Sequence, residues 1–484
     1  MTVQRLRGLD AAFFYLETPS QHMHLTATMI LEPAASVEDS AADPRAVAED
    51  LSQLLLQRLA ELPVFRRRVV AAPLGIAHPA WIDVPHFDPH EHARLLSLLP
   101  PGTVDQLREV VGDIAAVPLD RGRPLWELWT IAGVEGGRIG VVLKVHHALL
   151  DGVAGLAVLG SLFTTEPEAD VHSGAAHEEE AAEPSALQLA GSALLAVLRA
   201  PGKVAQTLLH TARAIPPVIR DALERASEAI PAVLPFSAPR SMLNRALTPE
   251  RAVAFGRVPL AVIKEIKAAY GVTVNDVVLA ACTYALGEYL RAHGEHPQHA
   301  IVASVPVSEH VADEDGQLSN RVSAMFVGLP VHLTSADEIV AFIHAQSVGA
   351  KRTYESFGPA MLADWVELAP PALFARAAVL YSRWELAERL PPPHSIVISN
   401  VAGPPFPLYA GTLRLAAAYP LGPVLEGAGL NISVVSYAGF VDVGIISCPR
   451  AVAEPGEIAC GFERGAEELL AAARRAGAAR PVGF

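Results

Sequence analysis

Two stretches in the first third of the chain alternate apolar and polar residues, and each predicts a β-strand. In the stretch His24–Leu31, one side of an extended chain carries Leu25, Ala27, Met29 and Leu31. The second strand is predicted over Ile139–Val145, after a turn at Gly136-Gly137. Between the two strands, Asp43-Pro44 precedes leucines at helical spacing, which predicts a helix that begins there and ends at Pro63. This part of the chain therefore mixes helices and strands.

The same mixture recurs in the second half of the chain. The pattern predicts a long helix over Val274–Leu290 and strands over Ala300–Pro306 and Ser395–Val401. Two further strands, Leu430–Tyr437 and Phe440–Ser447, are separated by Ala438-Gly439 and predict a β-hairpin. The chain therefore reads as two α/β halves of comparable size.

The composition changes sharply between these halves. Residues 165–184 read TEPEADVHSGAAHEEEAAEP, which is acidic and lacks hydrophobic periodicity, so we expect a linker or exposed loop. The next segment, 185–230, is helical in pattern and comparatively basic; it is either a helix pair that bridges two domains or an amphipathic patch that docks on lipid. We expect an N-terminal domain over 1–164, the linker and bridging segment over 165–237, and a C-terminal domain over 238–484.

Composition and charge exclude several classes of protein. The 484 residues are 51% hydrophobic and 18% charged, which supplies large cores and excludes a mostly disordered chain. A net charge of −15 disfavours nucleic-acid binding. Three cysteines without a C-x-x-C pair disfavour a disulfide framework and a cysteine zinc site. No secretory signal and no run of about 18 apolar residues is visible, so we expect a cytoplasmic protein. The sequence also lacks the glycine motifs of dinucleotide and P-loop folds.

The second predicted strand leads directly into the sequence His146-His147-Ala148-Leu149-Leu150-Asp151-Gly152. Because side chains alternate along a strand, the two histidines are expected to point in opposite directions, which disfavours a shared metal ion. Both histidines could simply be core residues beside a turn made by Asp151 and Gly152. Alternatively, His147 is a general base at the end of a rigid strand, since a neutral imidazole can accept a proton near physiological pH.

The HHxxxDG pattern resembles that of the CoA-dependent acyltransferase superfamily, which has the chloramphenicol acetyltransferase-like fold. More narrowly, the chain resembles the bacterial wax ester synthase/acyl-CoA:diacylglycerol acyltransferase family from end to end. The other matching segments are Leu9-Asp10-Ala11, Met23-His24, Pro124-Leu125-Trp126, Ala238-Pro239-Arg240, Asn275-Asp276, Pro306-Val307-Ser308 and Ser399-Asn400-Val401-Ala402-Gly403-Pro404. Two departures concern substrate preference: Ala402 stands where proline is usual, and Glu309-His310 stands where a basic residue is common.

The resemblance implies an α/β fold of two chloramphenicol acetyltransferase-like domains, whose mixed sheets are flanked by helices, with an active-site tunnel at their interface. It implies an O-acyltransferase that moves a long acyl group from acyl-CoA to diacylglycerol or a fatty alcohol. Acyl-CoA is then a substrate, and neither a metal nor a cofactor is expected. Peripheral contact with a membrane or lipid droplet is one open expectation. Two other functions stay open: a condensation-type or polyketide-associated enzyme that uses carrier-protein thioesters, and a non-catalytic lipid- or acyl-CoA-binding relative.

Roles follow for individual residues. His147 would take the proton of the acceptor hydroxyl, His146 would support it, and Asp151 would organise the loop that holds it. Asn275 is expected either to stabilise the oxyanion from a helix N-terminus or to be an ordinary N-cap. The remaining motif residues are expected to shape the site or the fold: Gly152, Pro124, Leu125, Trp126, Asp276 and Ser308. Trp126 is expected in the core, on a strand that pairs beside the catalytic strand.

Overall fold

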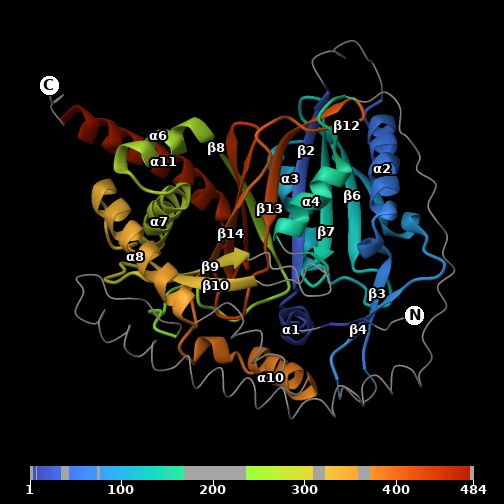
Figure 1. The fold of residues 1–484 in the computed structure, drawn as a ribbon, viewed down its shortest axis with the longest axis horizontal. Helices are drawn as coiled ribbons and strands as arrows, with labels where there is room; N and C mark the ends of the chain where they lie inside the picture. The colour runs from blue at the N-terminus through green and yellow to red at the C-terminus, as the bar shows by residue number, and fades with distance from the viewer. Residues whose placement is uncertain are drawn as a thin grey trace.

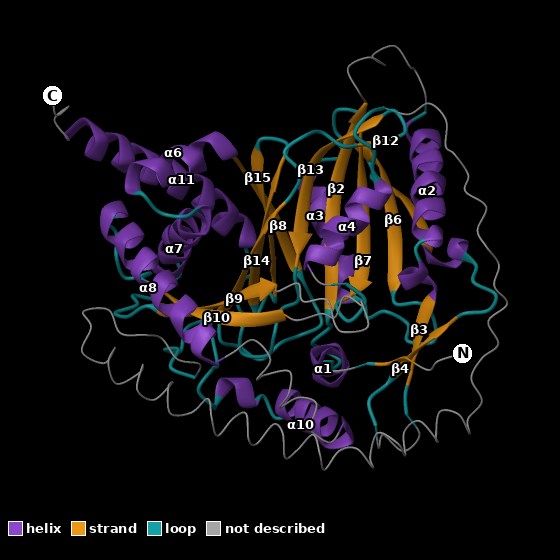
Figure 2. Ribbon diagram, viewed as in Figure 1, coloured by secondary structure: helices purple, strands orange, loops and turns teal. Residues whose placement is uncertain are grey.

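The structure is a computed structural model that describes residues 4–6, 8–33, 43–72, 77–150, 152–167, 236–308, 322–357 and 371–479. Two six-stranded sheets lie side by side, and helices pack against their faces (Figures 1 and 2). This confirms the expected α/β fold of two units. Asp151 and almost all of the expected linker and bridging segment lie outside the described residues.

The N-terminal sheet has the strand order β12-β13-β2-β7-β6-β5. Its strands are β2 (His24–Pro33), β5 (Ala93–Ser97), β6 (Trp126–Val134), β7 (Arg138–His146), β12 (Tyr409–Ala410) and β13 (Leu413–Leu421). Helices α2 (Pro44–Glu61) and α4 (Gly152–Leu162) pack on one face, and α3 (Val104–Ala116) packs on the other. The predicted first helix is confirmed, and the side chain of Asp43 caps it by accepting the N–H of Arg45.

The C-terminal sheet has the order β10-β9-β11-β14-β15-β8. Its strands are β8 (Ala252–Pro259), β9 (Ile301–Ser308), β10 (Val322–Leu329), β11 (Ile396–Ala402), β14 (Leu430–Tyr437) and β15 (Phe440–Ser447). Its helices are α6 (Leu260–Tyr270), α7 (Val274–Ala292), α8 (Ala336–Phe357) and α11 (Pro455–Ala479). The predicted hairpin is confirmed: β14 and β15 pair antiparallel, and Ala438 and Gly439 both have positive φ, as a tight hairpin turn requires.

One pair of strands crosses from the second half of the chain into the first sheet. β12 and β13 follow β11 in the sequence, yet β13 pairs antiparallel with β2 and completes the N-terminal sheet. β13 also touches the other sheet, because a Cβ atom at Gly444 of β15 would lie 2.0 Å from the carbonyl oxygen of Pro420. Only glycine permits that approach. The proposed boundary at residue 238 therefore divides the chain in sequence order only, because β12 and β13 follow this boundary and yet belong to the N-terminal sheet.

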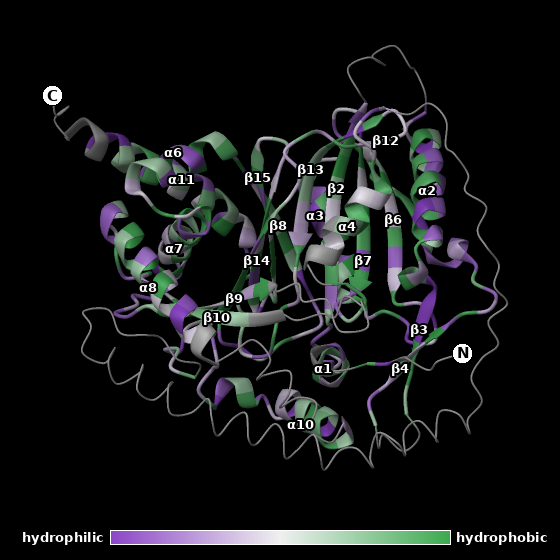
Figure 3. Ribbon diagram, viewed as in Figure 1, coloured by the Kyte–Doolittle hydropathy of each residue, from purple (hydrophilic) through white to green (hydrophobic). Residues whose placement is uncertain are grey.

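Smaller elements lie at one end of the two sheets. A three-stranded sheet is formed by β1 (Gln4–Arg5), β4 (Ala80–Asp83) and β3 (Arg67–Val70). Beside it lie helices α1 (Gly8–Leu16) and α10 (Pro371–Arg383), and short 3₁₀ turns occur at Pro63–Arg66, Pro89–His92 and Leu386–Glu388 (Figure 2). Figure 3 shows that the apolar residues concentrate in the central strands of both sheets.

A helix that crosses a bilayer needs about 20 consecutive, mostly apolar residues. Among the described helices, none is by itself long and apolar enough to cross a membrane. Helices α6 and α7 meet the requirement only as a pair, and that pair is bent by 104°.

Candidate active site

The two adjacent histidines stand at the end of β7, where the backbone holds both of them. The N–H of His146 donates to the carbonyl of Leu125 at 3.0 Å, and the N–H of His147 donates to the carbonyl of Met23 at 2.8 Å. His146 is 1% exposed, whereas His147 is half-buried. The segments before β6 and β2 therefore fix the end of the strand from both sides.

Helix α1 places an aromatic ring against each histidine. The ring of Phe13 lies 4.2 Å from the ring of His147, and the ring of Phe14 stacks on His146 at 4.2 Å with 12° between the planes. Contacts of this kind restrict the orientation of a ring. The sequence analysis assigned no role to either phenylalanine, because helical spacing alone does not say which strand a short apolar helix covers.

Glu17 directly follows α1, and its carboxylate lies beside the Nε2 atom of the His146 ring. The Nδ1 atom of His146 accepts the N–H of Ala148 at 3.1 Å, which assigns the ring proton to Nε2. That Nε2 lies 3.3 Å from Oε1 of Glu17. Burial alone would raise the pKa of Glu17, but the adjacent His146 ring and the Arg121 guanidinium outweigh it and hold this pKa below its usual range. Glu17 is therefore an anion that orients His146.

Glu17 also reaches the backbone that holds His147. Its Oε1 accepts the N–H of Met23 at 3.3 Å, and the carbonyl of Met23 accepts the N–H of His147. One carboxylate thus contacts the His146 ring and the peptide that supports His147. Glu17 was not predicted from the sequence, since only the packing of α1 against the end of β7 brings it to the histidines.

A buried cation lies on the same face of β7 as His146. Lys144 is 0% exposed, and its ammonium donates to the carbonyls of Ile114 at 2.9 Å and Val117 at 2.5 Å. It lies 3.5 Å from the carboxylate of Glu127 on the neighbouring strand. Burial lowers the pKa of Lys144, an effect that Glu127 opposes. Burial, together with the charge of Lys144, also lowers the pKa of His24 well below its ordinary value, so that ring is neutral.

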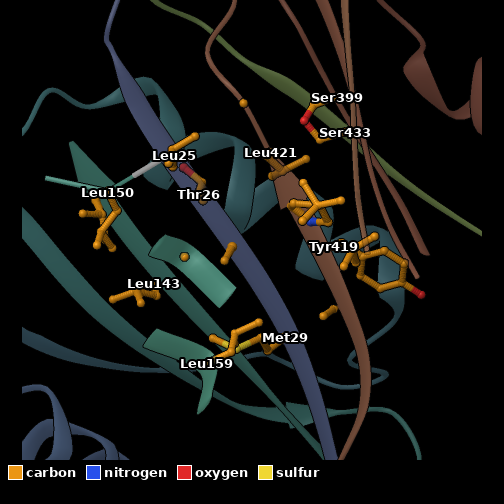
Figure 4. Close-up of a pocket in the computed structure, with 18 of the residues that line it drawn as sticks. Leu25, Thr26, Met29, Leu143, Leu150, Leu159, Ser399, Tyr419, Leu421 and Ser433 are labelled. Carbon is orange, nitrogen blue, oxygen red and sulfur yellow. The ribbon is translucent and has the colours of Figure 1, made fainter. Parts of the chain in front are cut away.

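The opposite face of β7 lines an apolar cavity between the two sheets (Figure 4). The cavity has a volume of about 160 Å³. Its walls come from β2, β7, α4, β11, β13 and β14, and the labelled residues are Leu25, Thr26, Met29, Leu143, Leu150, Leu159, Ser399, Tyr419, Leu421 and Ser433. Val145 and Leu150, which flank His147 in the sequence, both line it, although His147 does not. The expected tunnel that reaches His147 from two sides stays a prediction.

The Pro124-Leu125-Trp126 segment supports the strands behind the histidines. Trp126 is 0% exposed, stacks on His92 at 4.4 Å and donates its indole N–H to the carbonyl of Phe65 at 2.8 Å. It is a core residue, and β6, which it begins, pairs antiparallel with β7. The carbonyl of Leu125 accepts the N–H of His146, as described above. The segment therefore supports the histidines indirectly, through its packing in the core and the hydrogen bond that Leu125 accepts from His146.

Asn275 lies in the first turn of α7, directly after Val274. Thr273 caps α7 in a capping box with Asp276, so the interpretation of Asn275 as the N-cap is wrong. Oδ1 of Asn275 accepts a hydrogen bond from Asn400 at 3.3 Å. The neighbours of Asn400, Ser399 and Val401, line the cavity, so strand alternation turns Asn400 to the other face of β11.

The remaining motif residues have separate positions. Asp276 is 1% exposed, and its carboxylate oxygen Oδ2 also lies within hydrogen-bond distance of Nδ1 of His344, at 2.9 Å. Asp276 therefore stabilises the start of α7. Ser308 ends β9, where its Cα atom lies opposite that of Val322. Gly152 begins α4, while the side chains around it and Asp151 lie outside what the structure describes.

Comparisons with known proteins agree along nearly the whole chain. The wax ester synthase/diacylglycerol acyltransferase catalytic domain matches residues 6–278, and the C-terminal domain of the same family matches residues 318–470. A Mycobacterium tuberculosis H37Rv protein, provisionally named diacylglycerol O-acyltransferase, is 34% identical over 471 residues, which cover 97% of this chain and 90% of that protein. A second protein of the same strain and name is 34% identical, with 98% of each chain covered.

Solved structures give the same result. The wax ester synthase/diacylglycerol acyltransferase from Marinobacter aquaeolei VT8 superposes with a TM-score of 0.69 at 25% identity, and the match covers 97% of this chain and 100% of that one. The first condensation domain of the calcium-dependent antibiotic synthetase shares the fold, with a TM-score of 0.55 at 16% identity over 100% of this chain and 98% of that domain. The chain therefore belongs to the wax ester synthase/diacylglycerol acyltransferase family, a family of acyltransferases.

Proposed function

We propose that this acyltransferase moves a long acyl group from acyl-CoA to the hydroxyl of diacylglycerol or of a long-chain alcohol, with His147 as the general base. One observation carries the proposal: His147 directly follows β7 and lies in the sequence between Val145 and Leu150, which line an apolar cavity at the junction of the two sheets. Family membership supplies the reaction class, and the position of His147 supplies the base.

The reaction follows from a neutral imidazole at this position. His147 accepts the proton of the acceptor hydroxyl while the oxygen attacks the thioester carbonyl carbon. The tetrahedral intermediate then collapses, the carbon–sulfur bond breaks, and the CoA thiolate takes the proton from the imidazolium. The products are an ester and free CoA, and no covalent acyl-enzyme is required.

The surroundings of His147 suit this role. The carbonyl of Met23 fixes its backbone and the ring of Phe13 restricts its own ring, so the base is held in place before the substrates bind. The apolar walls of the cavity suit a hydrocarbon chain. Two roles stay predictions: Asp151 as the organiser of the loop, and Asn275 with the first-turn N–H groups of α7 as donors to the oxyanion.

A panel of acceptors tests the proposal. With a long-chain acyl-CoA, the full-length protein is expected to release CoA when diacylglycerol or hexadecanol is added, and to release none with a carrier-protein thioester as the acyl donor and an amine as the acceptor. The measurement is CoA release together with ester formation. Transfer only from the carrier protein would favour the condensation-type enzyme, and binding without transfer to any acceptor would favour a lipid-binding relative.

A charge-neutral substitution at Glu17 tests its role as a positioning residue. Glu17→Gln keeps the size of the side chain but removes the negative charge that His146 faces. Loss of this charge beside His146 is expected to lower kcat by about tenfold, which corresponds to about 1.4 kcal/mol. The KM for acyl-CoA is expected to change little, because Glu17 orients the histidines rather than the donor.

The matched control for this substitution is Glu127→Gln. Glu127 faces Lys144 in the same polar region, and its recorded partners do not include either histidine. This control is expected to keep kcat within about twofold of wild type. If both variants lose the same activity, or if Glu17→Gln changes only the KM, Glu17 does not position the catalytic histidines.

A further inference from the structure

Helix α10 carries an apolar stripe on its outward face. Leu373, Ala377, Leu380 and Trp384 follow one another at spacings of four, three and four residues, which places them on one side of the helix and its C-terminal turn. Leu373 is 65% exposed, Leu380 is 40% exposed and Trp384 is 56% exposed. Such a stripe normally faces a core, yet no residue of α10 is buried.

The opposite side of α10 packs against the rest of the protein. Phe374 and Ala375 pack against the apolar cluster of α1, and the rings of Phe374 and Tyr15 meet at 6.0 Å. Farther along, the hydroxyl of Ser382 donates to Glu426 at 2.6 Å. Figure 2 shows α10 at the outer edge of the molecule beside α1. The helix is therefore attached through its inner face, and its outer stripe is left uncovered by the residues that the structure describes.

Positive charge flanks this outer stripe. Arg376 and Arg383 are exposed and lie next to it on the helix. The nearest exposed carboxylate in the sequence, Glu385, is paired with Arg450 at 2.9 Å. Leucine, tryptophan and arginine together on one helix face are typical of helices that lie in the interface of a membrane. In a chain whose net charge is −15, these exposed arginines are a local exception that suits anionic headgroups.

We propose that the outer stripe of α10 docks this enzyme on a lipid surface that contains anionic phospholipid. The function of the docking rests on the proposed acyl transfer, because diacylglycerol and long-chain alcohols reside in lipid rather than in water. Its place in the fold suits this purpose: α10 packs on α1, and Phe13 of α1 lies against His147. A lipid surface bound at α10 is therefore separated from the catalytic histidine by one helix.

The test measures co-sedimentation of the full-length protein with vesicles of phosphatidylcholine, with and without phosphatidylglycerol. The triple variant Leu373→Gln, Leu380→Gln, Trp384→Gln removes the apolar stripe at exposed positions and should stay folded. Its partition coefficient on mixed vesicles is expected to fall by at least about tenfold. The matched control replaces exposed apolar residues elsewhere, Leu96, Leu99 and Phe406, with glutamine and is expected to bind like wild type.

A second variant separates charge from apolar burial. Arg376→Gln with Arg383→Gln is expected to weaken binding to vesicles that contain phosphatidylglycerol and to leave binding to pure phosphatidylcholine unchanged. Equal binding of the triple variant and wild type to mixed vesicles would overturn the proposal. So would self-association of wild type that the triple variant loses, because the stripe would then cover a second copy.

The same experiment keeps docking and catalysis apart. Co-sedimentation requires no turnover, so a wild-type protein that binds vesicles without transferring acyl groups would contradict the proposed function and leave the docking intact. Conversely, the triple variant is expected to keep wild-type turnover on a soluble short-chain alcohol and to lose turnover on vesicle-embedded diacylglycerol. Loss of both activities together would show damage to the site and would count against a docking role.

Discussion

His147→Ala is expected to lower the rate of acyl transfer by more than about two orders of magnitude, which is the typical contribution of a positioned general base. The loss should appear in kcat, because the imidazole acts on the hydroxyl proton only as the carbon–oxygen bond forms. The fold should survive: the side chain is half-buried, and the backbone N–H of residue 147 still donates to Met23. CoA release with diacylglycerol or hexadecanol is the measurement.

A histidine outside the site supplies the control for this experiment. His293 is the C-cap of α7, and its side chain is 34% exposed. His293→Ala is expected to keep wild-type turnover, and thermal unfolding of both variants should stay close to wild type. Undiminished transfer in His147→Ala would show that another group takes the proton and that the proposed mechanism is wrong.

Lys144→Met is expected to lower the free energy of unfolding by about 3 to 5 kcal/mol, because it breaks a buried charged network by removing one partner. Methionine fills a similar volume but donates no hydrogen bond. The carbonyls of Ile114 and Val117 would then lose their donor, and Glu127 would lose its cation. Urea unfolding measures the change, and the midpoint should fall without a change in slope.

An exposed pair with the same geometry provides the comparison. Arg67 and Asp83 face each other directly on β3 and β4, as Lys144 and Glu127 do on β7 and β6. The side chains of Arg67 and Asp83 are 34% and 53% exposed, so water already solvates them. Arg67→Met is expected to cost at most about 1 kcal/mol. Equal losses in the two variants would mean that burial does not set the contribution of Lys144.

The local pattern predicted most elements that have one solvent-facing side or a clear turn. The hairpin around Ala438-Gly439 matches in both strands, since period-two alternation and the turn residues are local signals. The alternation of the strand that begins at His24 was also informative, because Leu25, Ala27 and Met29 line the cavity. Strand β13 was not predicted, and no local signal states that it leaves its own half of the chain to pair with β2.

The candidate site divides in the same way. HHxxxDG is a contiguous motif, so the sequence alone drew attention to His147, whose role as the base stays a prediction. Glu17, Phe13 and Phe14 were missed because only the packing of α1 against the end of β7 brings them to the histidines. At the start of α7 the sequence offered Asn275 as a possible N-cap, whereas the structure has Thr273 there, whose side chain forms a capping box with Asp276.

The crossover of β13 also limits how substrates can enter the enzyme and products can leave it. Two lobes joined by a flexible hinge could separate to admit a lipid, but here β13 pairs with β2 along eight residue pairs in one sheet and packs closely on Gly444 of the other. Separation of the two sheets would pull β13 away from one of them and expose apolar surface. We therefore expect a hydrocarbon tail to enter and leave past side chains and loops at the edge of the cavity, while the two sheets stay in contact.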